Sequence, residues 1–208
     1  NIMEAGHMAA LEFDYFLFAV QGFSRVTETQ LVRKRVGASY MIKSGRAELG
    51  GKRSFSVVAP AMVTSHVAHI RLERNGEILE FPLSGYELCD VSRQFYDSCL
   101  EAEIPEEDAR YLKPQGTEFK ALIGMNAHAL HDWFKVRCCF NAQKEIRYMA
   151  NKILHSCKEV APDLFEQAGA SCKVLGYCPE NERQCQQLKD KYLKKSEAME
   201  ILKFHKKG

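Results

Sequence analysis

The sequence predicts an α+β fold with strands early in the chain and helices concentrated late. Aromatic and β-branched runs between turn residues occupy much of the first half. After residue 126, apolar side chains instead recur every three or four positions. With 208 residues, 46% of them hydrophobic, the chain can bury a substantial core, so we expect one main domain.

The first element is expected to be a strand over residues 11–23, which are aromatic and apolar with few breaks. A helix should follow from about Ser24. Residues 33–46, RKRVGASYMIKSGR, would then be the end of this helix and the loop that leaves it. Gly37 and Gly45 would let such a loop approach an anionic ligand closely, and its arginines could grip phosphate oxygens. A solvated basic face is the alternative, and the stretch alone does not decide.

The middle of the chain predicts a hairpin and two helices. Strands are expected over residues 54–59, 67–73 and 78–83, and Asn75-Gly76 should join the last two by a tight turn. Residues 86–102 predict an amphipathic helix. A short helix should start near residues 103–107, with Pro105 early and acids in its first turn, and should end before Pro114.

Two apolar faces after residue 126 predict two helices. One face carries Asn126, Leu130, Trp133, Phe134 and Arg137, whereas Ala142, Ile146, Met149, Ile153 and Cys157 lie on nearly the opposite side. One straight helix cannot bury both, so we expect a break near residues 138–140 and a second helix capped by Asn141. Arg137 would then lie on an apolar stripe at a helix end, where its charge needs a partner. An ion pair with an internal acid is the alternative to a ligand.

Composition and charge argue against a nucleic-acid or membrane partner. Lys and Arg number 29 against 27 Asp and Glu, and the cations are not interleaved with aromatic side chains, so we expect no nucleic-acid partner. No apolar run reaches the roughly 18–20 residues of a membrane span, and no signal peptide precedes Phe13. We expect a soluble, cytoplasmic protein. Because Asn1 is not an initiator methionine, we also expect a segment upstream of it.

Eight cysteines are present, and we expect them to be reduced because a chain of this size needs no disulfides. Cys172, Cys178 and Cys185, with His155 and His205 nearby in sequence, form the only group that suggests a metal. Their gaps of five and six residues do not match the paired C-x₂₋₄-C spacing of structural zinc sites. We therefore predict no metal site and leave the role of these cysteines open.

Two stretches resemble the flavin-dependent thymidylate synthases. Residues 126–147 resemble that family's NARxLxxFLxLR…AQWEIR stretch, and residues 33–46 resemble its R-H-R-x-x-S-x-x-x-x-S-x-R signature. Shorter similarities, to GHxSxxE at residues 6–12 and to SR…QLVRHR at residues 24–35, keep the same order, as do those at residues 161–166 and 176–180. The chain departs from the pattern by one residue inserted before Ser39 and by three substitutions: Lys34 replaces a histidine, Asp132 an asparagine, and Ile42 an acid or glutamine.

The resemblance implies a mixed sheet packed with helices, in one domain over residues 1–185 followed by a helical tail over residues 186–208. It also implies a homotetramer with active sites between subunits. Such enzymes convert dUMP to dTMP, with methylenetetrahydrofolate as carbon donor and reduced FAD, recharged by NADPH, as hydride source. A relative that transfers another group to a pyrimidine nucleotide, or a catalytically silent flavin- and nucleotide-binding protein, would share the same motifs.

The resemblance also implies which residues bind each ligand. The nucleotide would be held by Gln30, Ser44, Gly45, Arg46, Arg110 and Arg137, of which Arg46 and Arg137 would act in catalysis. The FAD would be held by His7, Arg33, Lys34, Arg35, Asn126, His128 and Asp132. Arginine forks and serine hydroxyls suit a phosphate, and cations suit the flavin pyrophosphate. His128 and Asp132 lie four residues apart on one helical face, so a surface contact between the two is the alternative.

Overall fold

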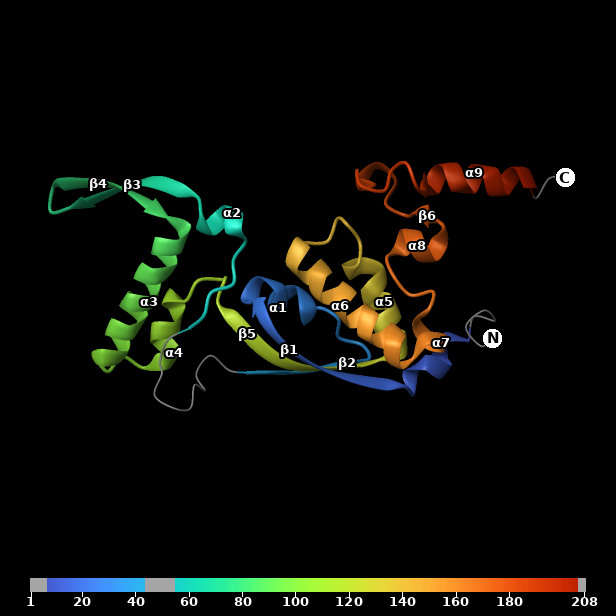
Figure 1. Ribbon diagram of the computed structural model, residues 1–208, viewed down its shortest axis with the longest axis horizontal. Coiled ribbons are helices and arrows are strands. Elements are labelled where there is room, and N and C mark those ends of the chain that lie inside the picture. Colours follow the sequence, from blue (N-terminus) through green and yellow to red (C-terminus); the bar gives the residue numbers. More distant parts are fainter. Residues whose placement is uncertain (1–6, 44–54, 206–208) are drawn as a thin grey trace. The chain divides into compact units, whose positions relative to one another are not determined.

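The computed structural model describes residues 7–43 and 55–205, which form two compact units (Figure 1). The first unit takes residues up to 18, residues 30–40 and residues from 123 onward; the second takes residues 19–29 and 41–122. A three-stranded sheet has the order β1 (Tyr15–Ser24), β5 (Glu118–Asn126), β2 (Ala38–Ile42). Helix α1 (Arg25–Leu31) follows β1 directly. The described residues thus combine helices with small sheets, as expected for an α+β fold.

The core of the first unit lies between α5 (Ala127–Arg137) and α6 (Lys144–Val160), which pack side by side (Figure 1). Leu130 and Phe134 of α5 and Ile146 of α6 are fully buried. Phe165, at the end of α7 (Pro162–Phe165), contacts the rings of Phe16, His131 and Phe134. These contacts fasten α7 and β1 to the α5 face.

Short elements complete the first unit. The 3₁₀ helix η1 (Met8–Glu12) precedes β1. After α7 come α8 (Ser171–Leu175), β6 (Tyr177–Cys178), η3 (Asn181–Arg183), β7 (Leu193–Lys194) and α9 (Lys195–His205). Strands β6 and β7 pair in parallel. Helix α9 lies within the predicted tail, whereas the domain boundary at residue 185 stays a prediction.

The second unit contains a hairpin and a long helix. Strands β3 (Val67–Arg74) and β4 (Glu77–Ser84) pair antiparallel, with Asn75 and Gly76 at φ 54° and 80° in the turn. Ser84 then caps α3 (Gly85–Glu101) in a capping box with Glu87. Helix α2 (Ala61–Thr64), α4 (Glu106–Ala109) and η2 (Arg110–Leu112) are short. Phe55, Tyr96 and Ala109 form its small core.

The hairpin, the helix after it, the short helix before Pro114 and the break between α5 and α6 confirm the sequence predictions. Three local predictions were wrong. Residues 33–46 are not only a loop, because Ala38–Ile42 pairs into the sheet as β2. Residues 55–59 form no strand beyond an isolated bridge from Val57 to Thr117. Gln143, not Asn141, caps α6, and Asn141 donates to the Arg183 carbonyl instead.

Across the described ranges, no helix is both long enough and apolar enough to cross a membrane.

Candidate functional site

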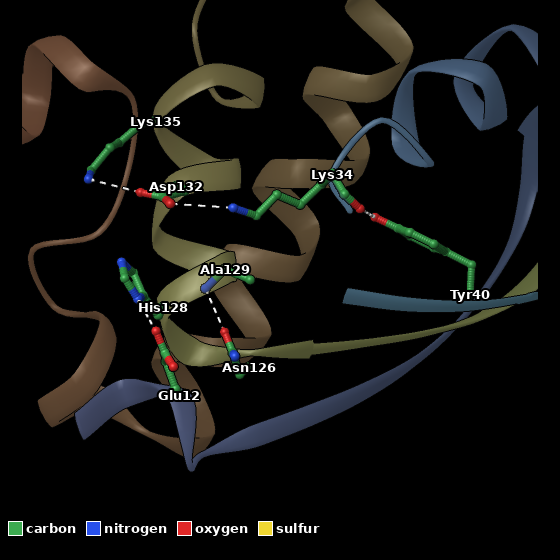
Figure 2. Close-up of polar contacts among 8 residues, drawn as sticks. All are labelled: Glu12, Lys34, Tyr40, Asn126, His128, Ala129, Asp132 and Lys135. Carbon is green, nitrogen blue, oxygen red and sulfur yellow. Dashed lines mark hydrogen bonds and ion pairs between the residues drawn. The ribbon is translucent and has the colours of Figure 1, made fainter. Parts of the chain in front are cut away.

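The first turn of α5 is locked to the segment that contains the basic residues 33–35. Asn126 ends β5 and caps α5, since its Oδ1 accepts a hydrogen bond from the Ala129 amide at 2.8 Å (Figure 2). Its own amide donates to the Gly37 carbonyl at 3.0 Å. Gly37 has φ +70°, and a Cβ there would lie 2.8 Å from Asn126 Oδ1 and 2.9 Å from the Ala129 Cβ. Only glycine allows this approach without displacing the helix start.

Lys34 and Asp132, two of the positions that depart from the thymidylate synthase pattern, contact each other. Lys34 Nζ lies 3.3 Å from Asp132 Oδ2, and Lys135 Nζ lies 3.3 Å from Oδ1. Figure 2 shows the carboxylate between the two ammonium groups. Burial alone would raise the pKa of Asp132, but the hydrogen bonds and charges of Lys135 and Lys34 outweigh it and leave this pKa below its ordinary value. Asp132 is therefore an ionised anchor for the Lys34 side chain.

His128 faces the N-terminal segment instead of Asp132. Its Nδ1 lies 3.3 Å from Glu12 Oε1, and both side chains are partly exposed (Figure 2). Among the described residues, His128 therefore contacts η1, whereas Asp132 contacts two lysines. The i,i+4 contact between His128 and Asp132, the alternative interpretation of this spacing, is not formed among them.

Arg137, at the end of α5, is held by backbone and not by an acid. One Nη2 hydrogen bond of 2.9 Å reaches the Gln30 carbonyl. Burial and the nearby positive charge of Arg33 lower the pKa of Arg137, while Tyr40 acts in the opposite direction. Arg137 forms no ion pair within the described part of the chain. The alternative to a ligand, an ion pair with an internal acid, is therefore not observed there. A half-buried guanidinium beside a second cation favours an anion as its partner.

Tyr40 supports the same corner from β2. Its hydroxyl lies 2.7 Å from the Lys34 carbonyl and 3.0 Å from the Leu31 carbonyl, so it donates to the backbone within and just before the basic residues 33–35 (Figure 2). Burial, followed by the charge of Tyr15, raises the pKa of Tyr40 to about 12, and Arg137 lowers it. The phenol thus stays protonated at neutral pH. Sequence reasoning missed Tyr40 because it expected a loop here, and β2 is what turns this ring toward Lys34.

The remaining predicted residues are exposed, belong to the second unit or lie outside the described residues. His7, Arg33 and Arg35 are exposed in the first unit. Arg110 belongs to the second unit, where its Nε donates to the Glu107 carbonyl at 3.0 Å. It lines a cavity of about 540 Å³ that also carries the basic residues Arg25, Lys43, Lys113 and Lys120. Ser44, Gly45 and Arg46 lie outside the described residues. The predicted residues that contact one another in the first unit are thus Gln30 with Arg137 and Lys34 with Asp132; Arg33, Asn126 and His128 belong to the same unit.

Two residues that contact this site, Lys135 and Glu12, were not predicted as site residues from the sequence. Lys135 is three residues from Asp132 on the same helix, a spacing at which opposite charges pair, so it could have been found. Glu12 ends the stretch that resembles GHxSxxE, but it is 116 residues from His128, so the sequence did not predict their contact.

The chain is similar to known proteins over most of its length. Residues 1–163 match the family model described as thymidylate synthase complementing protein. The flavin-dependent thymidylate synthase of Nitratidesulfovibrio vulgaris is 39% identical over 183 residues, which cover 88% of this chain and 72% of the relative. The enzyme of that name from Geobacter sulfurreducens is 36% identical over 89% of this chain and 74% of its own length. The enzyme of that name from Clostridium tetani is 36% identical over 88% of this chain and 74% of its own length.

These matches confirm the resemblance that the motifs at residues 33–46 and 126–147 indicated. The chain belongs to the thymidylate synthase complementing protein family.

Proposed function

We propose that this protein is an FAD-dependent thymidylate synthase that methylates dUMP to dTMP, using methylenetetrahydrofolate as carbon donor and NADPH as the source of electrons. The names of its relatives support this activity. The structural observation that carries it is Arg137, a half-buried guanidinium without an acidic partner among the described residues and close to a second cation.

The nucleotide phosphate fits this corner by charge. Burial and then the positive charge of Arg33 lower the pKa of Arg137, and a phosphate with nearly two negative charges would offset the repulsion between the two cations. The Gln30 carbonyl fixes the direction of the Arg137 fork, so less rotamer freedom is lost when an anion binds. Ser44, Gly45 and Arg46, with Arg110, are proposed to complete the dUMP site, and Arg46 and Arg137 to act on the bound base.

The flavin site is proposed at the same basic residues, 33–35. Arg33 and Arg35 are exposed and have no acidic partner among the described residues, so this donor set fits the FAD pyrophosphate. His7, Lys34, Asn126, His128 and Asp132 would complete the set. When bound, the reduced flavin supplies the hydride. Lys34 would hold a fixed positive charge near it, and Asp132 would hold Lys34 in place.

We also propose a cytoplasmic homotetramer without a nucleic-acid or membrane partner. In the first unit, Phe13, Leu17 and Val36 are 90%, 71% and 82% exposed, which is a large apolar exposure for a subunit that acts alone. A neighbouring subunit would cover such side chains and could bring further arginines to the site.

The test is a product analysis. Purified protein is incubated with dUMP, methylenetetrahydrofolate and NADPH, and the products are identified by mass. We expect dTMP and a folate that has lost its one-carbon group. Arg71→Ala, on the exposed hairpin, serves as control for Arg137→Ala. Binding of FAD and dUMP without dTMP formation would overturn the proposal and point to another transferred group or to a silent binding protein.

A further inference from the structure

Four cysteines from separate elements meet at one cavity of the first unit. The cavity has a volume of about 220 Å³ and is lined by Cys139, Cys172, Cys178 and Cys185. Cys139 lies in the α5–α6 connection, Cys172 on α8, Cys178 on β6, and Cys185 after η3. Three of the four are buried, at 7–8% exposure, and none forms a disulfide. Sequence reasoning had grouped only the last three, because Cys139 is 33 residues upstream of Cys172.

The four thiols are close enough to influence one another electrically. Burial raises the pKa of Cys172, and the charges of Cys139, Cys178 and Cys185 raise it further. A thiolate at Cys172 is therefore disfavoured unless a cation lies beside it. Lys135 and Arg137 line the same cavity and can offset negative charge there.

The segment that supplies three of these cysteines has little regular structure of its own. Between residues 171 and 194, its elements are α8 with 5 residues, β6 with 2, η3 with 3 and β7 with 2. Such loop-rich segments are commonly held by a disulfide framework or a structural metal, because short elements bury too little apolar surface.

We propose that Cys139, Cys172, Cys178 and Cys185 bind one Zn²⁺ ion as a structural site. Zinc prefers four thiolates in a tetrahedron at about 2.3 Å from each sulfur. Binding converts four thiols to thiolates and releases four protons, so the site carries two net negative charges, which Lys135 and Arg137 partly balance. As the side chains stand, no three His, Cys, Asp or Glu in the described ranges are arranged to hold a metal. Zinc binding therefore requires the four thiol side chains that line the cavity to adopt other rotamers.

This site is separate from the chemistry of the proposed reaction. Its ligands are thiols, which the proposed methyl transfer does not use as nucleophiles, and its role is to clamp the 171–194 segment onto the end of α5. The proposal therefore does not rest on the proposed function, and its test needs no substrate.

Metal analysis of the purified full chain provides the test. We expect one zinc per chain. After removal by a chelator under reducing conditions, we expect Co²⁺ to restore one equivalent of metal with the thiolate-to-cobalt charge-transfer absorption of tetrahedral sulfur ligation. The melting temperature should fall on removal and recover on addition of Zn²⁺.

Cysteine variants locate the site. Cys172→Ser and Cys185→Ser should lose the stoichiometric zinc, whereas Cys89→Ser, on α3 of the second unit, should keep it. If the first two variants do not fold, the cobalt titration of the unaltered chain still decides. Absence of the charge-transfer band, a disulfide among the four cysteines in the protein as purified, or iron and sulfide in place of zinc would each overturn the proposal.

Discussion

Arg137 is held by a backbone carbonyl and not by an acid among the described residues. Its single described partner is the Gln30 carbonyl, which carries no full charge, and the charge that lowers its pKa is that of another cation, Arg33. An arginine that served only the fold would be expected to pair with an acid when half-buried. The arrangement therefore favours binding over stabilisation.

Arg137→Ala should weaken dUMP binding by roughly 2–4 kcal/mol, because one charged fork is lost and the phosphate is left underpaired. FAD binding should change much less, and the melting temperature should stay close to that of Arg71→Ala. Calorimetric titration beside a melting curve separates the outcomes. A large loss of stability with unchanged dUMP affinity would mean that Arg137 is structural.

Lys34 and Asp132 should tune the flavin in opposite directions. A cation near the ring favours the anionic reduced flavin and raises its reduction potential, so Lys34→His should lower the potential. Asp132→Asn removes the charge that partly neutralises Lys34 and should raise it. Spectroelectrochemical titration measures both, with Asp108→Asn in the second unit as control. Identical potentials in all variants would show that the pair does not face the flavin.

His131 should make stability depend on pH. It is 5% exposed, its Nε2 donates to the Leu164 carbonyl at 2.8 Å, and its ring stacks on Phe165. Burial lowers its pKa, as do the charges of Lys135 and His128, whereas the Leu164 bond and Asp132 oppose the shift. Below about pH 6.5 the unfolded chain therefore binds more protons than the folded one, and the unfolding free energy should fall as pH decreases.

Denaturant unfolding at several pH values between about 7.5 and about 5 would measure how the unfolding free energy changes with pH. These limits lie on the order of one unit either side of the ordinary histidine pKa. His131→Gln should flatten this pH dependence. His69→Gln, on the exposed hairpin, should keep the slope of the unaltered chain. Equal slopes in all three proteins would contradict a depressed His131 pKa.

At the scale of elements, α5 and α6 are separated by a short connection and begin with different kinds of cap. Asn126 caps α5 in the usual way, whereas the Gln143 side chain accepts from the Glu145 and Ile146 amides at 3.1 and 3.0 Å. Glutamine is not among the preferred cap residues, so the sequence pattern favoured the wrong residue, Asn141.

Gln143→Ala should destabilise the protein by about 1 kcal/mol, because two amides at the start of α6 lose their acceptor. Asn141→Ala should cost less, since it removes one exposed hydrogen bond to the Arg183 carbonyl. Urea unfolding of both variants compares the two caps. A larger cost for Asn141→Ala would show that the cap assignment is reversed.

At the scale of the whole molecule, the main prediction concerns assembly. Phe13, Leu17 and Val36 expose apolar surface that a solitary subunit would leave in water. We expect light scattering to report a tetramer at micromolar concentration. Leu17→Lys should shift the population toward smaller species, whereas Leu72→Lys, on the exposed hairpin, should not. A monomer at all concentrations would contradict a site shared between subunits.

What the sequence could predict depended on the distance between interacting residues. The Asn75-Gly76 turn and the break after Arg137 were predictable, because each is decided by neighbours within one or two helical turns. The β2 strand was not, because Ala38–Ile42 sits among glycines and cations and becomes a strand only by pairing within the sheet. Family membership could also be predicted from the sequence, because several family motifs occur in the same order along the chain.

The sequence by itself therefore determined the α+β character, the hairpin, the helix pair and the family. Only the tertiary structure decided which side chains meet. Lys34 reaches Asp132 across 98 residues, and Arg137 reaches Gln30 across 107. Cys139 joins three cysteines that follow it by 33 or more positions. Such long-range contacts produce no periodic pattern in the sequence, because local backbone geometry does not depend on them. They form only when packing of the core brings distant elements together.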